Sequence, residues 1–255
     1  MTSTADIHPS TKIAMITGGN RGLGLATARL LGQADVTVLI GARDRVRGEC
    51  AAAQLRREGV YAHAVALDVT SETSVEHAAD YVASRYGRVD ILVNNAGILP
   101  EVTRPNIDWP LDLNAFRKTF DTNVLGAVTT TKYFLPLLHK STAGRIVNVS
   151  STMGSLADQS DPTSPYYGQV VPAYQMSKAA LNGLTIALSK ALAESAIKVN
   201  SICPGWVQTD LGGPANRAAA PTRAADAAAI VVEMALLDND GPTGQFFDRA
   251  GAVAW

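Results

Sequence analysis

A tyrosine and a lysine stand four positions apart, as Tyr174 and Lys178, in a stretch whose apolar spacing is typical of a helix. Residues four apart share one face of a helix, so we expect the lysine ammonium near the phenol. A cation ~5 Å away at an effective dielectric of ~20 favours the phenolate by roughly 3 kcal/mol, or about two pKa units. The pair therefore predicts a general acid and base whose pKa moves from ~10 toward the working pH.

A glycine-rich segment runs from Thr17 to Gly24, after the first apolar run and before a helical pattern. Its glycines permit a tight turn and let backbone N–H groups approach a pyrophosphate at a helix N-terminus. Such a turn taken alone can equally be a strand-to-helix connection that needs positive φ. Its position between the first strand and the first helix favours a dinucleotide site.

Five further segments follow in order: Asn94-Asn95-Ala96-Gly97, Asn123, Ser151, the Tyr174/Lys178 pair, and Pro204-Gly205-Trp206-Val207-Gln208-Thr209. Together with the spacing T-G-x-x-x-G-x-G, they resemble the short-chain dehydrogenase/reductase family over about residues 12 to 250. The run Gly-Gly-Asn-Arg-Gly-Leu-Gly, followed later by Ala-Arg-Asp, is most similar to the NADPH-dependent carbonyl reductases. The resemblance implies a Rossmann-type fold and a nicotinamide cofactor.

The resemblance also implies a role for each catalytic residue. Tyr174 gives a proton to the alkoxide formed when hydride reaches a carbonyl carbon, and Lys178 hydrogen-bonds the nicotinamide ribose. Ser151 positions the substrate oxygen; we prefer it to Ser150 because the family serine stands three residues before a glycine, here Gly154. Asn123 helps to hold a water against the lysine, although a mid-helix asparagine alone is more often a local cap or kink.

Arginines replace the acidic residue that an NAD site usually places after the second strand, where this sequence has Gly41-Ala42-Arg43. Arg43, Arg21 and Arg47 could clamp a 2′-phosphate through charge-assisted bonds, which predicts NADP(H). A solvated helix face is the alternative for Arg47. Asp68 and Val69 match family residues that contact the adenine, or they belong to a helix start that Thr70 or Ser71 caps.

The candidate residues form two sets. Asn95 is expected to be structural, tying neighbouring strands beneath the dinucleotide. The predicted catalytic residues are Asn123, Ser151, Tyr174 and Lys178. The predicted cofactor-binding residues are Gly18, Asn20, Arg21, Gly22, Leu23, Gly24, Arg43, Arg47, Asp68, Val69, Asn95, Ala96, Gly97, Tyr174, Lys178, Pro204, Gly205, Val207 and Thr209.

The elements that must position these residues alternate between short apolar runs and longer amphipathic stretches, which predicts a doubly wound α/β fold with a seven-stranded parallel sheet and helices on both faces. The predicted strands are Lys12–Thr17, Val36–Ile40, Ala62–Leu67, Ile91–Val93, Arg145–Val149, Lys198–Ile202 and Gln245–Phe247. The predicted helices are Gly22–Leu31, Arg45–Glu58, Ser71–Tyr86, Leu113–His139, Ala173–Glu194 and Thr222–Leu236.

We expect one domain over residues 1–255, with a flexible tail at 1–11 and active-site loops at 151–172 and 204–221. Ser151 and Tyr174 are 23 residues apart, more than in many family members, so residues 158–171 form an insert beside the pocket. Its aromatics are Tyr166 and Tyr167. With Trp206, Ile98 and Leu99 they could wall an apolar pocket, or they could merely anchor the insert. The insert also leaves open whether the protein is a monomer or an oligomer.

Composition argues against several other classes of protein. The net charge is −1 without a sustained basic run, which disfavours a nucleic-acid partner. The sequence has no run of 18 apolar residues, which a membrane span would need, and its start lacks a signal-peptide pattern. We therefore expect a soluble cytoplasmic protein. The two cysteines are expected to be reduced, and the four scattered histidines disfavour a metal site.

The leading hypothesis is a reversible NADPH-dependent reduction of a small-molecule ketone, aldehyde or quinone to its alcohol, by a carbonyl reductase or alcohol dehydrogenase. A sugar-nucleotide epimerase or dehydratase shares the Tyr-x-x-x-Lys pair but typically has a longer chain. A cofactor-sensing regulator of the same fold is the alternative from another class. Such relatives typically lose the tyrosine that this chain keeps as Tyr174.

Overall fold

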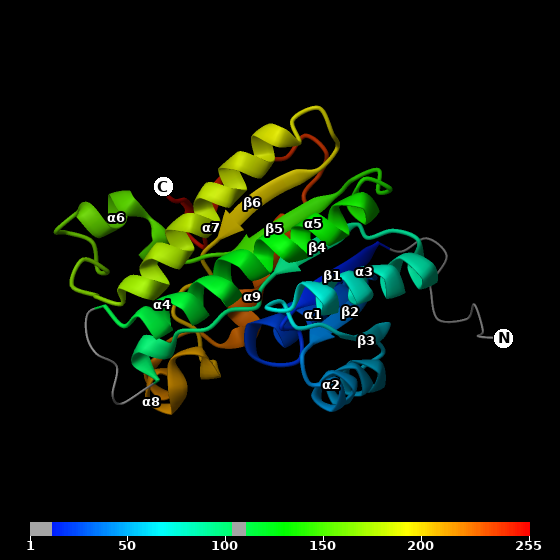
Figure 1. The fold of residues 1–255 in the computed structure, drawn as a ribbon, viewed down its shortest axis with the longest axis horizontal. Helices are drawn as coiled ribbons and strands as arrows, with labels where there is room; N and C mark the ends of the chain where they lie inside the picture. Colours follow the sequence, from blue (N-terminus) through cyan, green and yellow to red (C-terminus); the bar gives the residue numbers. More distant parts are fainter. Residues whose placement is uncertain (1–11, 104–110) are drawn as a thin grey trace.

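A central, mostly parallel sheet organises the computed structural model, which describes residues 12–103 and 111–255 (Figure 1). Its strand order is β3-β2-β1-β4-β5-β6-β7-β8. The predicted tail at residues 1–11 lies outside the described residues. The strands are β1 (Ile13–Thr17), β2 (Thr37–Ala42), β3 (Ala62–Ala66), β4 (Ile91–Asn94), β5 (Arg145–Val149), β6 (Lys198–Ile202), β7 (Phe246–Asp248) and β8 (Gly251–Ala252).

Seven strands pair in parallel, which confirms the predicted Rossmann-type sheet. The eighth, β8, is antiparallel to β7 and was not predicted. It returns through a turn in which the Asp248 carboxylate accepts the N–H groups of Ala250 and Gly251. Two residues are too few to carry an alternating pattern, so this strand could not be predicted from the sequence.

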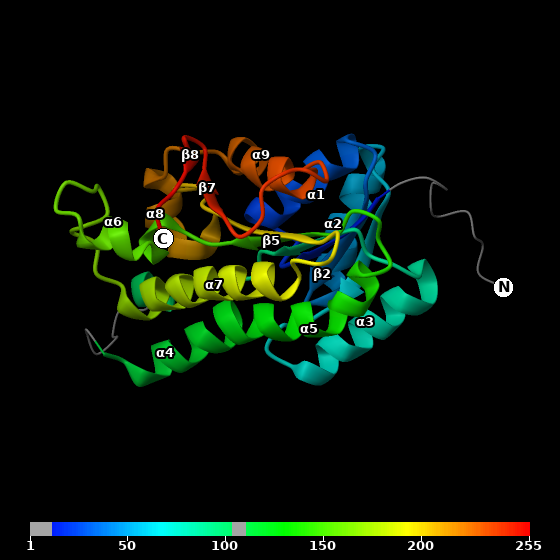
Figure 2. The ribbon, with the colours of Figure 1, turned by 90° about the horizontal axis from the view of Figure 1, so that it is seen from above.

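Helices cover both faces of the sheet (Figure 2). The apolar cores on the two faces show which helices share a face. One face carries α1 (Gly22–Gln33), α2 (Arg45–Arg57) and α9 (Ala224–Ala235). The other carries α3 (Glu72–Tyr86), α5 (Gly126–Leu138) and α7 (Pro172–Ala191). Figure 2 shows α4 (Leu113–Phe120) on this same face.

The side chains of β1 alternate between these two cores. Ala14 and Ile16 pack toward α1, α2 and α9, whereas Ile13 and Met15 pack toward α3, α5 and α7. Every residue of β1 is buried. Because both faces are covered, the strand reads as a continuous apolar run rather than as an alternation of apolar and polar residues.

The long helix predicted over Leu113–His139 is interrupted by a π-helical turn, Asp121–Leu125, between α4 and α5. Directly after it, Gly126 packs so closely on Val69 that an added Cβ would lie 2.8 Å from the Val69 Cγ2 atom. Turns of this kind occur often at functional sites because the extra residue re-aims side chains. Here the turn contains Asn123.

Both predicted active-site loops contain short helices. The first holds a 3₁₀ turn, Thr152–Gly154, and α6 (Leu156–Ser160). The second holds a 3₁₀ turn, Asp210–Gly212, and α8 (Gly213–Ala219). The strand order reverses between β1 and β4, and parallel sheets of this class bind ligands beyond the strand ends at that point.

Candidate active site

The glycine turn after β1 has the backbone geometry that only glycine adopts readily. Gly18 and Gly22 have φ angles of +61° and +54°. Gly24 leaves no room for a side chain, because an added Cβ would lie 2.6 Å from both the Gly18 carbonyl oxygen and the Asn95 amide nitrogen. The backbone here is therefore free of side-chain bulk at the start of α1, as a diphosphate cradle requires.

Asn95 joins the segment after β4 to this turn. Its side-chain amide donates to the carbonyl oxygens of Thr17 and Gly18, at 2.8 and 3.2 Å. The Thr17 hydroxyl oxygen accepts the N–H groups of Asn95 and Ala96, both at 2.9 Å. These bonds agree with the structural tie that we expected of Asn95.

Tyr174 and Lys178 share a buried face of α7, with exposed fractions of 6% and 4%. The Lys178 Nζ atom lies 5.5 Å from the centroid of the Tyr174 ring. It donates a hydrogen bond of 2.7 Å to the carbonyl oxygen of Val149, at the end of β5. The helical spacing thus brings the two groups together as predicted.

The predicted lowering of the tyrosine pKa is wrong for this structure. Burial raises the pKa of Tyr174, the nearby Cys203 raises it further, and only the Ser151 side chain lowers it. Burial also lowers the pKa of Lys178 to about 8, which weakens the cation on which the prediction relied. Sequence spacing revealed the neighbour but not the loss of water around both groups.

The two adjacent serines have different partners. The Ser151 side chain lowers the pKa of the Tyr174 phenol, and its hydroxyl oxygen accepts the Met153 N–H at 3.2 Å. Ser150 is buried and its hydroxyl donates to the Lys178 carbonyl oxygen at 3.3 Å. The structure therefore places Ser151, and not Ser150, at the phenol.

Asn123 is buried, and its side chain is fully engaged. The Asn123 amide donates to the Ile98 carbonyl oxygen and to the Ser177 hydroxyl, each at 3.0 Å. Its Oδ1 atom accepts the Ile98 N–H at 2.9 Å. The side chain thus braces the segment after β4 against α7, rather than capping its own helix.

The three arginines lie in different environments. Arg21 pairs with Asp210, in the loop after β6, at 3.6 Å. Arg47 pairs with Asp44, which precedes it by three residues, at 3.3 Å, and its side chain is 73% exposed. Arg43 directly follows β2 and is exposed.

Asp68 and Val69 follow β3 closely. An Asp68 carboxylate oxygen accepts the N–H and hydroxyl groups of Thr70, at 3.0 and 2.7 Å. Ser71 is the residue that caps α3, where its hydroxyl oxygen accepts the Ser74 N–H. The cap that we left open between Thr70 and Ser71 is therefore Ser71.

The loop after β6 reaches back to the glycine turn. An added Cβ on Gly22 would lie 3.2 Å from the Thr209 Cγ2 atom. The next residue, Asp210, pairs with both Arg21 and Arg217 of α8. Sequence reasoning missed Asp210, because its contact with Arg21 joins segments that are far apart in the chain, and it therefore also missed Arg217, which pairs with Asp210.

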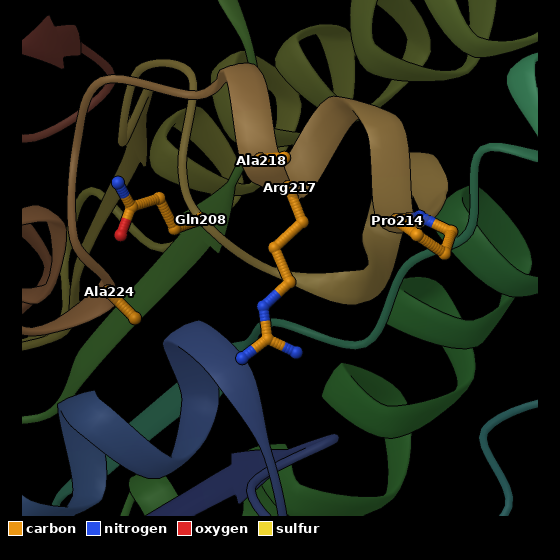
Figure 3. A pocket seen from close by; sticks show the side chains of 5 residues that line it. All are labelled: Gln208, Pro214, Arg217, Ala218 and Ala224. Carbon is orange, nitrogen blue, oxygen red and sulfur yellow. The ribbon is translucent and has the colours of Figure 1, made fainter.

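A cavity of about 400 Å³ opens beside α8 (Figure 3). It is lined by Gln208, Pro214, Arg217, Ala218 and Ala224. The Arg217 side chain extends from α8 into this opening. Through Asp210, which pairs with Arg217 and with Arg21, the cavity adjoins the glycine turn.

The insert aromatics are only partly covered. Tyr167 and Trp206 are about half exposed, at 52% and 50%, and Tyr166 is partly buried. The helix within this loop, α6, is tied to another part of the chain by the Ala157 N–H, which donates to the Trp255 carbonyl oxygen at 3.0 Å. Both expectations for the aromatics, pocket wall and anchor, stay predictions.

Comparison with known proteins decides the family. The family model for "short chain dehydrogenase" matches residues 12–220. The chain belongs to this family. It is therefore an oxidoreductase of the short-chain dehydrogenase type.

Two curated relatives of this short-chain dehydrogenase match nearly its whole length. A (+)-neomenthol dehydrogenase from Capsicum annuum is 31% identical, covering 96% of this chain and 98% of its own. A carbonyl reductase [NADPH] 1 from Sus scrofa is also 31% identical, covering 96% and 95%. The solved structure of an NADPH-bound carbonyl reductase from chicken fatty liver superposes with a TM-score of 0.80 at 27% identity, covering 96% and 99%.

Within the described ranges, no group of three or more His, Cys, Asp and Glu side chains is arranged to hold a metal ion. None of the helices in the described part of the chain is both long and apolar enough to span a membrane.

Proposed function

We propose that this short-chain dehydrogenase reduces ketones, aldehydes or quinones to alcohols with NADPH, and catalyses the reverse reaction with NADP⁺. The observation that carries the proposal is the buried face of α7 that holds Tyr174 and Lys178 together, with Ser151 close enough to the phenol to lower its pKa. This arrangement brings together a polarising hydroxyl, a proton donor and a cation, from Ser151, Tyr174 and Lys178 respectively. The two carbonyl reductases among the relatives support the same reaction class.

The residues fit a dinucleotide. The positive φ angles at Gly18 and Gly22, and the lack of space for a Cβ at Gly24, leave main-chain N–H groups accessible to a diphosphate. Arg43 stands after β2, where an acid would favour the ribose hydroxyls of NAD. Arg43 and Arg21 would hold the 2′-phosphate of NADP(H).

When bound, the reduced nicotinamide supplies a hydride to the carbonyl carbon. The Ser151 hydroxyl would donate a hydrogen bond to the substrate oxygen and hold it beside the Tyr174 phenol. Because burial raises the pKa of Tyr174, the phenol keeps its proton at neutral pH. It is then ready to protonate the alkoxide that forms on the substrate.

Lys178 and Asn123 support this proton transfer. The Lys178 ammonium would stabilise the phenolate that remains after the proton has left and would hydrogen-bond the nicotinamide ribose. Asn123 ties Ile98, in the segment after β4, to Ser177 on α7. Half-exposed Trp206 and Tyr167 favour an apolar aryl or alkyl carbonyl as substrate.

The test follows NADPH and NADH absorbance separately with purified protein and a panel of aryl ketones, aliphatic aldehydes, quinones and steroid ketones. We expect carbonyl-dependent oxidation of NADPH far above that of NADH. Tyr174→Phe, which removes only the hydroxyl, should abolish turnover while NADPH binding persists. Full activity in Tyr174→Phe would disprove the acid assignment, and tight NADPH binding without turnover by the unmodified protein would favour the sensor.

A further inference from the structure

Glu101 caps the helix that carries the catalytic tyrosine, from a different part of the chain. It lies in the 3₁₀ turn Pro100–Val102, which follows the segment after β4. Its two carboxylate oxygens accept two main-chain N–H groups of α7, from Ala173 at Oε1 and from Tyr174 at Oε2, both at 2.9 Å. One of these N–H groups therefore belongs to the proposed acid itself.

The start of α7 needs such an acceptor. An N-cap residue usually accepts the N–H of the second or third helical residue, which here are Ala173 and Tyr174. The N-cap of α7 is Val171, which has no side-chain acceptor, and the first helical residue, Pro172, has no N–H. Glu101 supplies both missing acceptors, and its negative charge lies at the positive end of the helix dipole.

The segment containing Glu101 also holds the other end of the Tyr174 main chain. The Tyr174 carbonyl oxygen accepts a bond from the Ser177 hydroxyl at 2.8 Å. That hydroxyl in turn accepts a bond from Asn123, which is bonded to both main-chain groups of Ile98. Hydrogen bonds therefore join residues 98–101 to both main-chain groups of Tyr174. Glu101 accepts its N–H, and Ile98 is linked to its carbonyl oxygen through Asn123 and Ser177.

This segment borders the reacting groups. An added Cβ on Gly97 would lie 3.8 Å from the Lys178 Nζ atom and 3.5 Å from Asn123 Oδ1. Residues 97–101 therefore form a wall of the site to which the start of α7 is fixed. Displacement of a reacting group by about 1 Å can cost a hundredfold in rate, so a fixed reference of this kind matters for proton transfer.

We propose that Glu101 is a positioning residue for Tyr174, whose carboxylate fixes α7 to residues 97–101 and so holds the phenol beside Ser151. The proposal rests on the proposed function. Glu101 touches no reacting atom; it acts through the main chain of Tyr174. Its loss should lower the rate of the chemical step more than it weakens the binding of cofactor or substrate.

The first test compares Glu101→Ala and Glu101→Gln with the unmodified protein. Alanine has no side-chain acceptor. The glutamine carboxamide has one acceptor oxygen, and its NH₂ group would face the second N–H. Both variants therefore lose the bidentate contact. We expect kcat to fall about tenfold or more in both. The KM for the carbonyl and the Kd for NADPH should stay within about twofold. Unchanged kcat in both variants would overturn the proposal.

A second variant separates capping from positioning. In Glu101→Ala/Val171→Asp, the aspartate at the N-cap position of α7 can accept the same N–H groups, as N-cap residues do. We expect this double variant to regain the Tm lost by Glu101→Ala but not its kcat, because the tie to residues 97–101 is still absent. Recovery of both Tm and kcat would mean that Glu101 serves only as a cap, and would overturn the proposal.

Ser141→Ala is the matched control for general loss of stability. Ser141 also makes two hydrogen bonds, to the Asp90 carboxylate and from the Ala143 N–H, at the opposite end of the strands. It should lower Tm and leave kcat unchanged; an equal fall in kcat would overturn the assignment to Glu101. Absence of turnover in the unmodified protein would overturn both proposals together, whereas normal turnover in Glu101→Ala overturns only the role of Glu101.

Discussion

Ser150 and Ser151 are neighbours in sequence, but only Ser151 lowers the pKa of the Tyr174 phenol, whereas the Ser150 hydroxyl donates to the Lys178 carbonyl oxygen. We expect Ser151→Ala to lower kcat about a hundredfold, because it removes a donor aimed at the oxygen on which charge develops. Ser150→Ala loses only a bond to the Lys178 carbonyl oxygen and should keep nearly full kcat. Steady-state kinetics of the pair check the assignment, and the reverse order of effects would contradict it.

Arg43 is the residue on which we expect cofactor preference to depend most. Arg43→Asp removes a cation and places an acid where NAD-dependent relatives of this fold use one for the ribose hydroxyls. A charge-assisted bond is worth roughly 1.5–3 kcal/mol, so the ratio of kcat/KM for NADPH to that for NADH should fall at least about tenfold.

Arg47→Ala is the comparison for that experiment. Arg47 pairs with Asp44 on an exposed helix turn, so we expect its removal to change cofactor preference far less than Arg43→Asp does. A larger effect of Arg47→Ala would transfer the phosphate contact from Arg43 to Arg47.

The activity should depend on pH through Lys178. Burial lowers the pKa of this ammonium to about 8, so its charge is present below that pH and is lost above it. The kcat/KM for carbonyl reduction reports the pKa values of the free enzyme and should therefore fall as the pH rises through about 8. A pH profile of kcat/KM that stays flat to about pH 10 would contradict this assignment.

Lys178→Arg provides the check on this limb of the profile. A guanidinium remains charged throughout the range, so the falling limb should move to higher pH. The maximum rate should nevertheless be lower, because a planar fork does not replace a compact ammonium that donates to the Val149 carbonyl oxygen.

Among the elements, the 3₁₀ turn after Ser151 is fixed by close packing on α7. An added Cβ on Gly154 would lie 2.6 Å from the carbonyl carbon of Lys178, which is backbone and cannot rotate away. Gly154→Ala should therefore separate the turn from α7, lowering Tm and, through displacement of Ser151, also kcat. Thermal melts and kinetics together measure both effects.

Gly183→Ala, on the same helix, is the matched control. Gly183 is exposed, and an added Cβ there meets no atom within 4 Å. Replacing a mid-helix glycine by alanine stabilises a helix by about 1 kcal/mol, so this variant should raise Tm and leave kcat unchanged. Similar behaviour of the two variants would disprove the packing argument for Gly154.

The elements also mark the limit of sequence reasoning. The strands and the Tyr174/Lys178 pair were predictable because periodicity and helical spacing are local properties of the chain. The π-helical turn at Asn123 was not, because it depends on packing against distant residues such as Val69. The same applies to Glu101, whose partners lie 72 and 73 positions away, and to the pKa of Tyr174, whose rise reflects burial.

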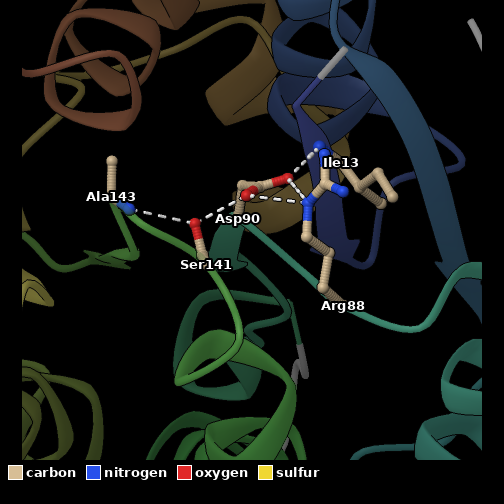
Figure 4. Close-up of polar contacts among 5 residues, drawn as sticks. All are labelled: Ile13, Arg88, Asp90, Ser141 and Ala143. Atoms are coloured by element: carbon tan, nitrogen blue, oxygen red, sulfur yellow. Dashed lines mark hydrogen bonds and ion pairs between the residues drawn. The ribbon is translucent and has the colours of Figure 1, made fainter. Parts of the chain in front are cut away.

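At the scale of the whole molecule, the two ends of the sheet have different roles, one in the proposed site and one in stability. The proposed site lies at the carboxyl ends of the strands, around the reversal of strand order between β1 and β4. At the other end, the carboxylate of Asp90, just before β4, links several segments (Figure 4). It accepts the Ile13 N–H at 2.8 Å and the Ser141 hydroxyl at 2.6 Å, and it pairs with Arg88 at 3.2 Å.

Asp90→Ala tests whether this end serves stability alone. The side chain of Asp90 is only 9% exposed, and its removal leaves the N–H of buried Ile13 without its acceptor. Breaking a buried, charged hydrogen-bond network typically costs about 3–5 kcal/mol, and we expect a loss near the lower figure because Arg88 is partly solvated. Urea unfolding should show this loss, while kcat and KM of the folded protein at 25 °C stay near their normal values. A large fall in kcat without loss of stability would mean that the two ends of the sheet are coupled. The strands would then transmit a change at Asp90 to the segment after β4, which carries Asn95 and Glu101.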